Sequence, residues 1–437
     1  MSQLTRQLGL FTCILLVIGN IIGVGIFTTP GEIAAGLPSS GWILLAWIIG
    51  GLMATAGALT YGELGAMFPK AGGNYVFLKE AFGPLWGFLY GMAYCLITSP
   101  GAIALLAIGF SEYAGLPTGT LSSKAISISV VAILTFFNWR GVKLGAGVMD
   151  FLTLTKIVVM LLLVVVGFAI GKGQATHFQP LFSGNSGNAL FAIAVALVPM
   201  AFAYSGWNST VLVGEEVKNP GRIIPLSLLL GTLATTAIYV LMNAVYLYAV
   251  PVGKLVGEVR IADLTAANLF GSGAQVITKG LVALSVLGCI SASLLANPRT
   301  AFALGRDGLF LKSLGKVHPK YNTPGNAILF QGIWACVLIA WGDFGKILSL
   351  LSAPLVVIFT MTVISIFVFR FKKPQLERPY RCWGYPVVPA LYVVISCFMI
   401  YAKFQSKGVE GIYGIGIFIL GVPVYYLWKR YYKTNEG

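Results

Sequence analysis

Two apolar segments of the sequence are interrupted by glycines where a helix could open. They are Ile18-Gly19-Asn20-Ile21-Ile22-Gly23-Val24-Gly25-Ile26-Phe27 and Pro199-Met200-Ala201-Phe202-Ala203-Tyr204-Ser205-Gly206-Trp207-Asn208. An opened helix frees backbone N–H and carbonyl groups, which must be buried in protein or line a cavity because lipid cannot bind them. Freed N–H groups suit a carboxylate and freed carbonyls suit an ammonium, so the pattern predicts a site for a zwitterion such as an amino acid. The alternative is glycines that let two helices cross closely, which is common in membranes. The paired interruptions favour the site.

Lys156 is the single residue that says most about the site, because it is a charged residue near the middle of the apolar run 145–171. A lysine at the centre of a bilayer costs about 2.5–3.5 kcal/mol on insertion scales. From that depth the side chain has difficulty reaching either interface, so we expect it to point into the protein toward hydrogen-bond acceptors. If the helix begins later than the run indicates, Lys156 lies closer to the membrane edge instead.

Signatures of catalysis and of metal binding are missing from the sequence. His177 and His318 are the only histidines and both fall between apolar runs, so no HExxH motif or histidine-based metal cluster exists. The six cysteines show no disulfide framework and no metal-ligand spacing. We therefore predict no catalytic residue, no metal and no cofactor, and we do not expect an enzyme.

Carboxylates are absent beside both interruptions, which predicts a substrate without a cationic side chain. Glu215 and Glu216 form the one adjacent acidic pair that could suggest acid–base chemistry. Because they follow the second interrupted segment at a helix end, we interpret them as solvated or bridging to Lys218 and Arg222.

The elements that must position these residues are membrane-spanning helices. The chain has 437 residues, 57% of them hydrophobic and only 10% charged, with a mean hydropathy of +0.85. A soluble protein carries about 25% charged residues. Runs long enough to cross ~30 Å of hydrocarbon predict about twelve spans, at 10–36, 41–68, 85–113, 124–138, 145–171, 188–214, 223–251, 275–298, 325–342, 344–369, 386–403 and 410–428.

The net charge of +15 is distributed by the side of the membrane. Connecting segments on one side hold twenty Lys and Arg residues, and those on the other side hold seven. The positive-inside rule makes the first side cytoplasmic, with both termini there, in a multi-pass protein of the cell membrane. This distribution accounts for the basic net charge, so we exclude nucleic acid as a partner. The protein is expected to lie in a lipid bilayer.

The interrupted spans are the first and the sixth, so the chain divides into halves of five spans each at about 10–171 and 188–371. An odd number of spans in each half gives them opposite orientation, which predicts an inverted repeat within one transporter domain, 1–437. The remaining spans, about 386–430, are two additional C-terminal helices.

Several motifs resemble the amino acid–polyamine–organocation superfamily, and most closely its L-type amino acid transporter branch. The resemblance covers essentially the whole chain and rests most on the glutamate pair followed by Lys-Asn-Pro. The motifs are Gly23-Val24-Gly25-Ile26-Phe27, Pro69-Lys70-Ala71-Gly72-Gly73-Asn74-Tyr75, Glu215-Glu216-Val217-Lys218-Asn219-Pro220-Gly221-Arg222-Ile223-Ile224-Pro225, Gly305-Arg306-Asp307-Gly308-Leu309 and His318-Pro319-Lys320-Tyr321-Asn322-Thr323-Pro324.

This resemblance implies the all-α fold of leucine-type sodium symporters, with five-plus-five inverted repeats and spans 1 and 6 unwound. It implies that the substrate carboxylate meets amides around Val24 and Gly25, and that the ammonium meets carbonyls of the two breaks. Phe202 resembles an aromatic gate, and Tyr239 a tyrosine near the site. The substrate-binding residues expected in this way are Ile21, Ile22, Gly23, Val24, Gly25, Ile26, Phe202, Ala203, Ser205 and Tyr239.

Lys156 matches a lysine that takes the place of a sodium ion in relatives, and its expected acceptors are the carbonyls of Gly19 or Ile22 and the hydroxyl of Ser291. Animal members pair with a heavy chain through a cysteine between spans 3 and 4. Residues 114–123 contain no cysteine, so we expect no covalent heavy-chain partner.

Together these observations predict a sodium-independent exchanger of small or medium neutral L-amino acids that works by alternating access. A proton-coupled symporter remains the alternative if Lys156 can lose its proton, and a carrier of cationic amino acids or polyamines is the second. A channel needs a continuous polar pore lining, which the sequence does not show.

Overall fold

The computed structural model describes residues 4–37, 39–117, 119–183, 186–258, 260–342, 344–407 and 416–435. Within these ranges the regular secondary structure is helical, apart from isolated β-bridges that join Leu8 to Val217 and Ala71 to Val213.

Both interruptions predicted from the glycines are present. Helix α1 (Leu10–Ile21) and helix α2 (Gly25–Gly36) are separated by three residues and bent by 46° relative to each other. Helix α9 (Ser186–Ala203) ends before a turn, and the short helix α10 (Ser209–Leu212) follows. Gly206 lies in this turn with φ of +106°, a conformation that residues with a Cβ rarely adopt.

Most of the other helices follow the predicted apolar runs, but four short helices lie between the runs and were not predicted, at Asn74–Phe82, Val252–Leu255, Ile261–Phe270 and Pro298–Arg306. In the first half they are α3 (Ser40–Met67), α4 (Asn74–Phe82), α5 (Pro84–Ala93), the π-helical turn η1 (Tyr94–Thr98), α6 (Ser99–Tyr113), α7 (Leu121–Trp139) and α8 (Val142–Ile170). In the second half they are α11 (Pro220–Ala249), α12 (Val252–Leu255), α13 (Ile261–Phe270), α14 (Gln275–Ala296), α15 (Pro298–Arg306), α16 (Gly325–Trp341) and α17 (Phe344–Lys372). Helices α18 (Val387–Lys407) and α19 (Gly416–Asn435) come last, and residues 410–415 of the final predicted run lie outside the described ranges.

Among the described residues, seven helices are long and apolar enough to cross a membrane, and the bent pair α1–α2 makes an eighth if it is one span. Shorter apolar helices lie at Phe191–Ala203, Ile261–Phe270, Gly325–Trp341 and Val387–Ala402. The chain is therefore a multi-pass membrane protein. Its exposed surface agrees: on α8 the side chains of Phe151, Val165 and Ile170 are 69%, 63% and 75% exposed.

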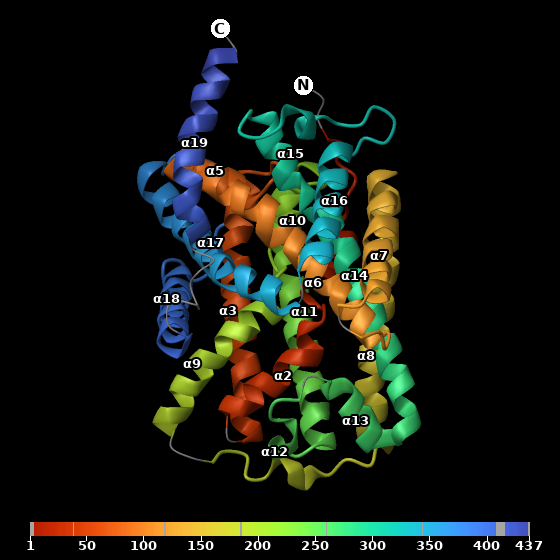
Figure 1. Cartoon of the computed structure of the whole chain (residues 1–437). Helices are drawn as coiled ribbons and strands as arrows, with labels where there is room; N and C mark the ends of the chain where they lie inside the picture. Colours follow the sequence, from red (N-terminus) through yellow and green to blue (C-terminus); the bar gives the residue numbers. More distant parts are fainter. Residues whose placement is uncertain are drawn as a thin grey trace.

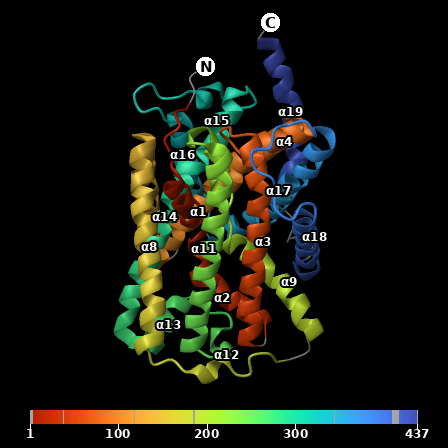
Figure 2. The ribbon, with the colours of Figure 1, turned by 180° about the vertical axis from the view of Figure 1, so that it is seen from behind.

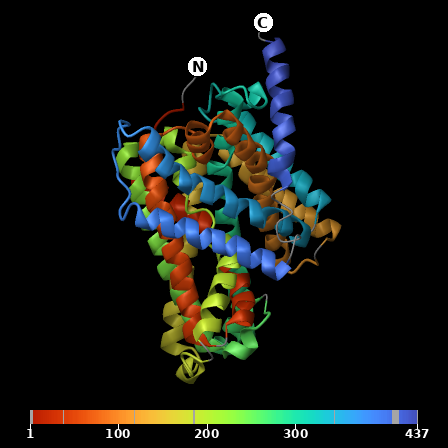
Figure 3. The ribbon, with the colours of Figure 1, turned by 90° about the vertical axis from the view of Figure 1, so that its left-hand side faces the viewer.

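The long helices run between two ends of the molecule (Figures 1 and 2). The residues that precede α1, the helix α15 and the end of α19 gather at one end, whereas α12, α13 and residues 171–183 lie at the other. Figure 3 shows α18 crossing the outside of the bundle at a steep angle to α3. The broken helices are inside, where α1 packs against α8, α11 and α14.

Candidate binding site

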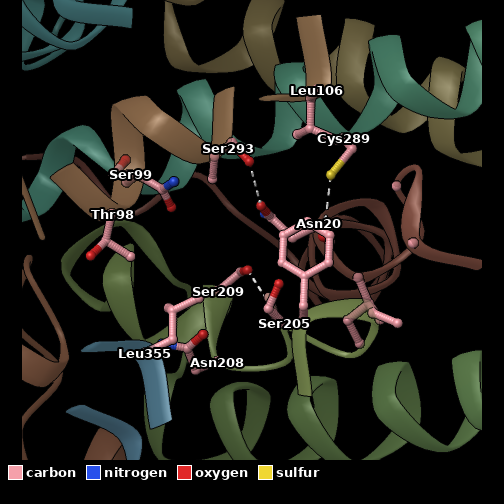
Figure 4. A pocket seen from close by; sticks show the side chains of 18 of the residues that line it. Asn20, Thr98, Ser99, Leu106, Ser205, Asn208, Ser209, Cys289, Ser293 and Leu355 are labelled. Carbon is pink, nitrogen blue, oxygen red and sulfur yellow. Dashed lines mark hydrogen bonds between the residues drawn. The ribbon is translucent and has the colours of Figure 1, made fainter. Parts of the chain in front are cut away.

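A cavity lies between the two helix breaks and has about 780 Å³ of empty space, including its open mouth. Its wall comes from both breaks and from η1, α6, α14 and α17 (Figure 4). Seven of the predicted substrate-binding residues line it: Ile21, Gly23, Val24, Gly25, Phe202, Ala203 and Ser205. Ile22, Ile26 and Tyr239 do not line it.

The amides of Val24 and Gly25 begin the first turn of α2. A helix supplies no carbonyl partner for its first N–H groups, and no side chain caps this turn. The positive end of the helix dipole adds to the attraction for an anion. A Cβ on Gly25 would lie only 2.9 Å from Cα of Ala203, so glycine is required where the two breaks meet. This part of the cavity suits a carboxylate.

The carbonyls of the two breaks face Tyr239. Its hydroxyl lies 2.9 Å from the Ile21 oxygen and 3.0 Å from the Ala203 oxygen, and its side chain is fully buried behind the cavity wall. Tyr239 therefore joins the two breaks to each other and does not face the cavity. The Ile21 oxygen also accepts the Gly23 N–H at 2.9 Å, so both of its lone pairs are in use, whereas the Ala203 oxygen retains acceptor capacity. The Phe202 carbonyl already accepts the Ser205 N–H at 3.0 Å.

Lys156 is fully buried and its ammonium donates to backbone carbonyls of the first break. Nζ lies 2.6 Å from the Ile22 oxygen and 2.9 Å from the Gly19 oxygen, so both predicted contacts are confirmed. The predicted contact with Ser291 is wrong: its hydroxyl has no hydrogen-bond partner, and the third acceptor is the Ser285 carbonyl at 3.5 Å. Six residues turn a helix by about 240°, so Ser285 and Ser291 face different directions on α14.

Sequence reasoning missed a set of polar side chains in the cavity wall. The Ser293 hydroxyl donates to the Asn20 side-chain oxygen at 2.9 Å, and the Cys289 thiol donates to the Asn20 carbonyl at 3.3 Å. On another wall, the Asn208 amide donates to Asn74 at 3.2 Å. An asparagine within an apolar run was the available signal for Asn20. Helix α14 has no sharp motif, and only packing shows which of its faces lines the cavity.

The glutamate pair lies at the end of the molecule where the chain begins. Glu216 is buried and forms a two-bond ion pair with Arg299, at 2.7 and 2.9 Å. Glu215 pairs with Arg306 at 3.0 Å. The interpretation of these carboxylates as solvated or bridging to Lys218 and Arg222 is therefore wrong. Their partners belong to α15, which approaches only in the folded chain.

The sequence pattern of the amino acid permease family matches residues 8–423, nearly the whole chain. This chain belongs to that family. The permease is 32% identical over 435 residues to the serine/threonine exchanger SteT of Bacillus subtilis, with 98% of each chain covered. It is 30% identical over 439 residues to the human b(0,+)-type amino acid transporter 1, covering 98% of the permease and 89% of that protein. The human large neutral amino acids transporter small subunit 2 is 30% identical over 433 residues, covering 97% and 80%.

These comparisons confirm the resemblance to the amino acid–polyamine–organocation superfamily and its L-type branch. The permease is an amino acid transporter, and its family and relatives are transporters and not enzymes.

Proposed function

We propose that this permease is a sodium-independent exchanger of small or medium neutral L-amino acids that works by alternating access. The observation that carries the proposal is the cavity between the breaks, which offers uncapped amides at Val24 and Gly25 on one side and, on another, carbonyls of Phe202 and Ala203 that retain acceptor capacity. A carboxylate and an ammonium on one carbon atom match these two groups.

The wall of the cavity supports a neutral substrate. Among the described residues that line it, the polar side chains are hydroxyls, amides and one thiol, and none is an Asp, Glu, Lys, Arg or His. A charged substrate side chain would lose its hydration there without a counter-charge, which is costly in a low-dielectric site. A carrier of cationic amino acids or polyamines is therefore the weaker alternative.

The position of Lys156 supports independence from sodium. Its ammonium donates hydrogen bonds to the carbonyl oxygens of Gly19, Ile22 and Ser285. A positive charge therefore lies between α8, the first break and α14. Hard cations such as sodium bind oxygen ligands of this kind. A charge that is covalently attached requires no bound ion, so the site is formed without one.

We also propose twelve spans, with inverted repeats at about 10–171 and 188–371 followed by two extra helices. The paired breaks support the repeat. The basic segments around α15 and the two chain ends lie at one end of the bundle, which supports cytoplasmic termini in a plasma-membrane protein. The cysteine-free segment 114–123 supports a permease that works without a covalent heavy chain.

Proteoliposomes test the transport mode. Uptake of labelled alanine, serine and leucine is measured with sodium and pH gradients varied independently, with and without amino acid inside. Exchange predicts uptake that needs internal amino acid and ignores both gradients. If an inward proton gradient instead drives uptake into empty vesicles, the permease is a symporter in which Lys156 gains and loses a proton. Inhibition by arginine or putrescine but not by alanine would overturn the neutral substrate.

A further inference from the structure

One wall of the cavity departs from regular α-helix where α5 passes into α6. Residues Tyr94–Thr98 form the π-helical turn η1, in which the Ser99 N–H donates to the Tyr94 carbonyl five residues earlier. Pro100 follows in the first turn of α6 and contributes no N–H of its own. Single π-helical turns inside α-helices occur frequently at functional sites. Here Tyr94 and Thr98 of the turn, and Ser99 directly after it, line the cavity.

The polar side chains around this wall differ in whether their hydrogen bonds are already made. Ser293 donates to Asn20, and Ser99 accepts a hydrogen bond from Gln331 Nε2 at 2.5 Å. Thr98 differs from both. It lines the cavity, it is only 3% exposed, and its hydroxyl has no hydrogen-bond partner within the protein. A buried hydroxyl without a hydrogen-bond partner is unfavourable, so a ligand that supplies the partner would be stabilised there.

We propose that Thr98 recognises the side chain of the substrate, and that the permease selects small amino acids whose side chain carries an uncharged hydrogen-bonding group, a hydroxyl or a primary amide. This inference rests on the proposed function, which places the substrate's carboxylate and ammonium at the two breaks. The Thr98 hydroxyl both donates and accepts, so it pairs with either kind of group. The Ser99 hydroxyl accepts from Gln331 and retains its own hydrogen to donate beside it.

A site built to bind a hydroxyl rejects the analogue that lacks it, because the buried protein group then stays unpaired. Threonine and valine have nearly the same shape and differ in this one group. We expect the wild-type permease to favour threonine over valine by about tenfold in Vmax/KM, the factor that corresponds to about 1.4 kcal/mol.

The experiment measures exchange of threonine, valine and alanine in proteoliposomes for the wild type and three variants. Thr98→Val removes the hydroxyl at constant shape and should bring the threonine-to-valine ratio close to one through a higher KM for threonine. Thr98→Ser keeps the hydroxyl and should keep the ratio. Thr55→Val is the matched control, because the Thr55 hydroxyl bonds to the Gly51 carbonyl within α3 and does not line the cavity.

The role of Thr98 would be overturned if Thr98→Val left the threonine-to-valine ratio unchanged, or if the wild type transported valine as well as threonine. In either case, alanine exchange by the wild type would still uphold the proposed function. The wild-type ratio decides the matter even if Thr98→Val does not fold. Absence of alanine, threonine and valine exchange in the wild type would overturn the proposed function, and this inference with it.

Discussion

The ammonium of Lys156 lies 2.6 Å from the carbonyl oxygen of Ile22, a residue 134 positions earlier in the chain. This contact fixes the backbone of the first helix break from outside the cavity, since neither Ile22 nor Lys156 lines it. The neighbouring carbonyls of Gly19 and Ser285 accept from the same group. Helix α8 thus holds the break in an open conformation that the α-helix itself would not maintain.

Replacement of Lys156 by alanine should impair transport. The substitution removes the donor from three buried carbonyls, and hydrogen bonds to a charged group contribute about 1.5–3 kcal/mol each. We expect exchange to fall by at least about tenfold, since 1.4 kcal/mol corresponds to that factor. Transport kinetics and thermal unfolding of the purified variant check this. Lys124→Ala is the control. Lys124 lies near the start of α7, does not line the cavity, and donates a hydrogen bond to the Ala340 carbonyl. Near-normal kinetics of Lys156→Ala would contradict the role assigned to this lysine.

Replacement of Gly25 by alanine should abolish substrate binding. The new Cβ would lie 2.9 Å from Cα of Ala203, so the two breaks must separate and the amides of α2 lose their position. Gly36→Ala makes the same change in the same helix where no atom lies within 4 Å, and it should be neutral. Alanine binding measured by ligand-induced thermal stabilisation distinguishes the two. Equal binding by both variants would show that the breaks do not form the site.

Replacement of Tyr239 by phenylalanine should destabilise the protein by about 1–3 kcal/mol, the cost of leaving the buried Ala203 acceptor unpaired. The lost hydroxyl bridges the Ile21 and Ala203 carbonyls and so connects the two breaks. Thermal unfolding in detergent measures the loss. Tyr426→Phe serves as the comparison, because that side chain is 58% exposed on α19. If the two variants unfold at the same temperature, the bridge contributes nothing to stability.

The two ion pairs of the glutamate pair should differ in their effect on stability. Arg299→Ala leaves the fully buried Glu216 carboxylate without its partner, which costs about 3–5 kcal/mol. Arg306→Ala breaks a pair whose side chains are 22% and 16% exposed, and the loss should be about 1 kcal/mol or less. Expression level and thermal unfolding of the two variants test the order. A larger loss of thermal stability for Arg306→Ala than for Arg299→Ala would show that the buried pair is not the more important of the two.

Several features followed from the sequence because they depend on neighbouring residues along the chain. Apolar runs predicted the helices, since crossing lipid requires a continuous apolar length. Glycines predicted both breaks. A lysine deep in an apolar run predicted its own burial among hydrogen-bond acceptors, because lipid offers it none, whereas the carbonyls of Gly19 and Ile22 were expected from the family resemblance. The first break, the second break and the environment of Lys156 were therefore predictable before any packing was known.

The tertiary structure alone decided which distant residues meet. The choice of Ser285 over Ser291 depends on the rotation of α14, and one residue of error turns a helix face by about 100°. The pairing of Glu216 with Arg299 and the place of Tyr239 behind the cavity depend on how whole helices pack. Thr98 is one polar residue within an apolar run, and only the fold shows that its hydroxyl is unpaired at the cavity. Local sequence determines which segments form helices and where they break, whereas contacts between side chains depend on the relative rotation and position of those helices.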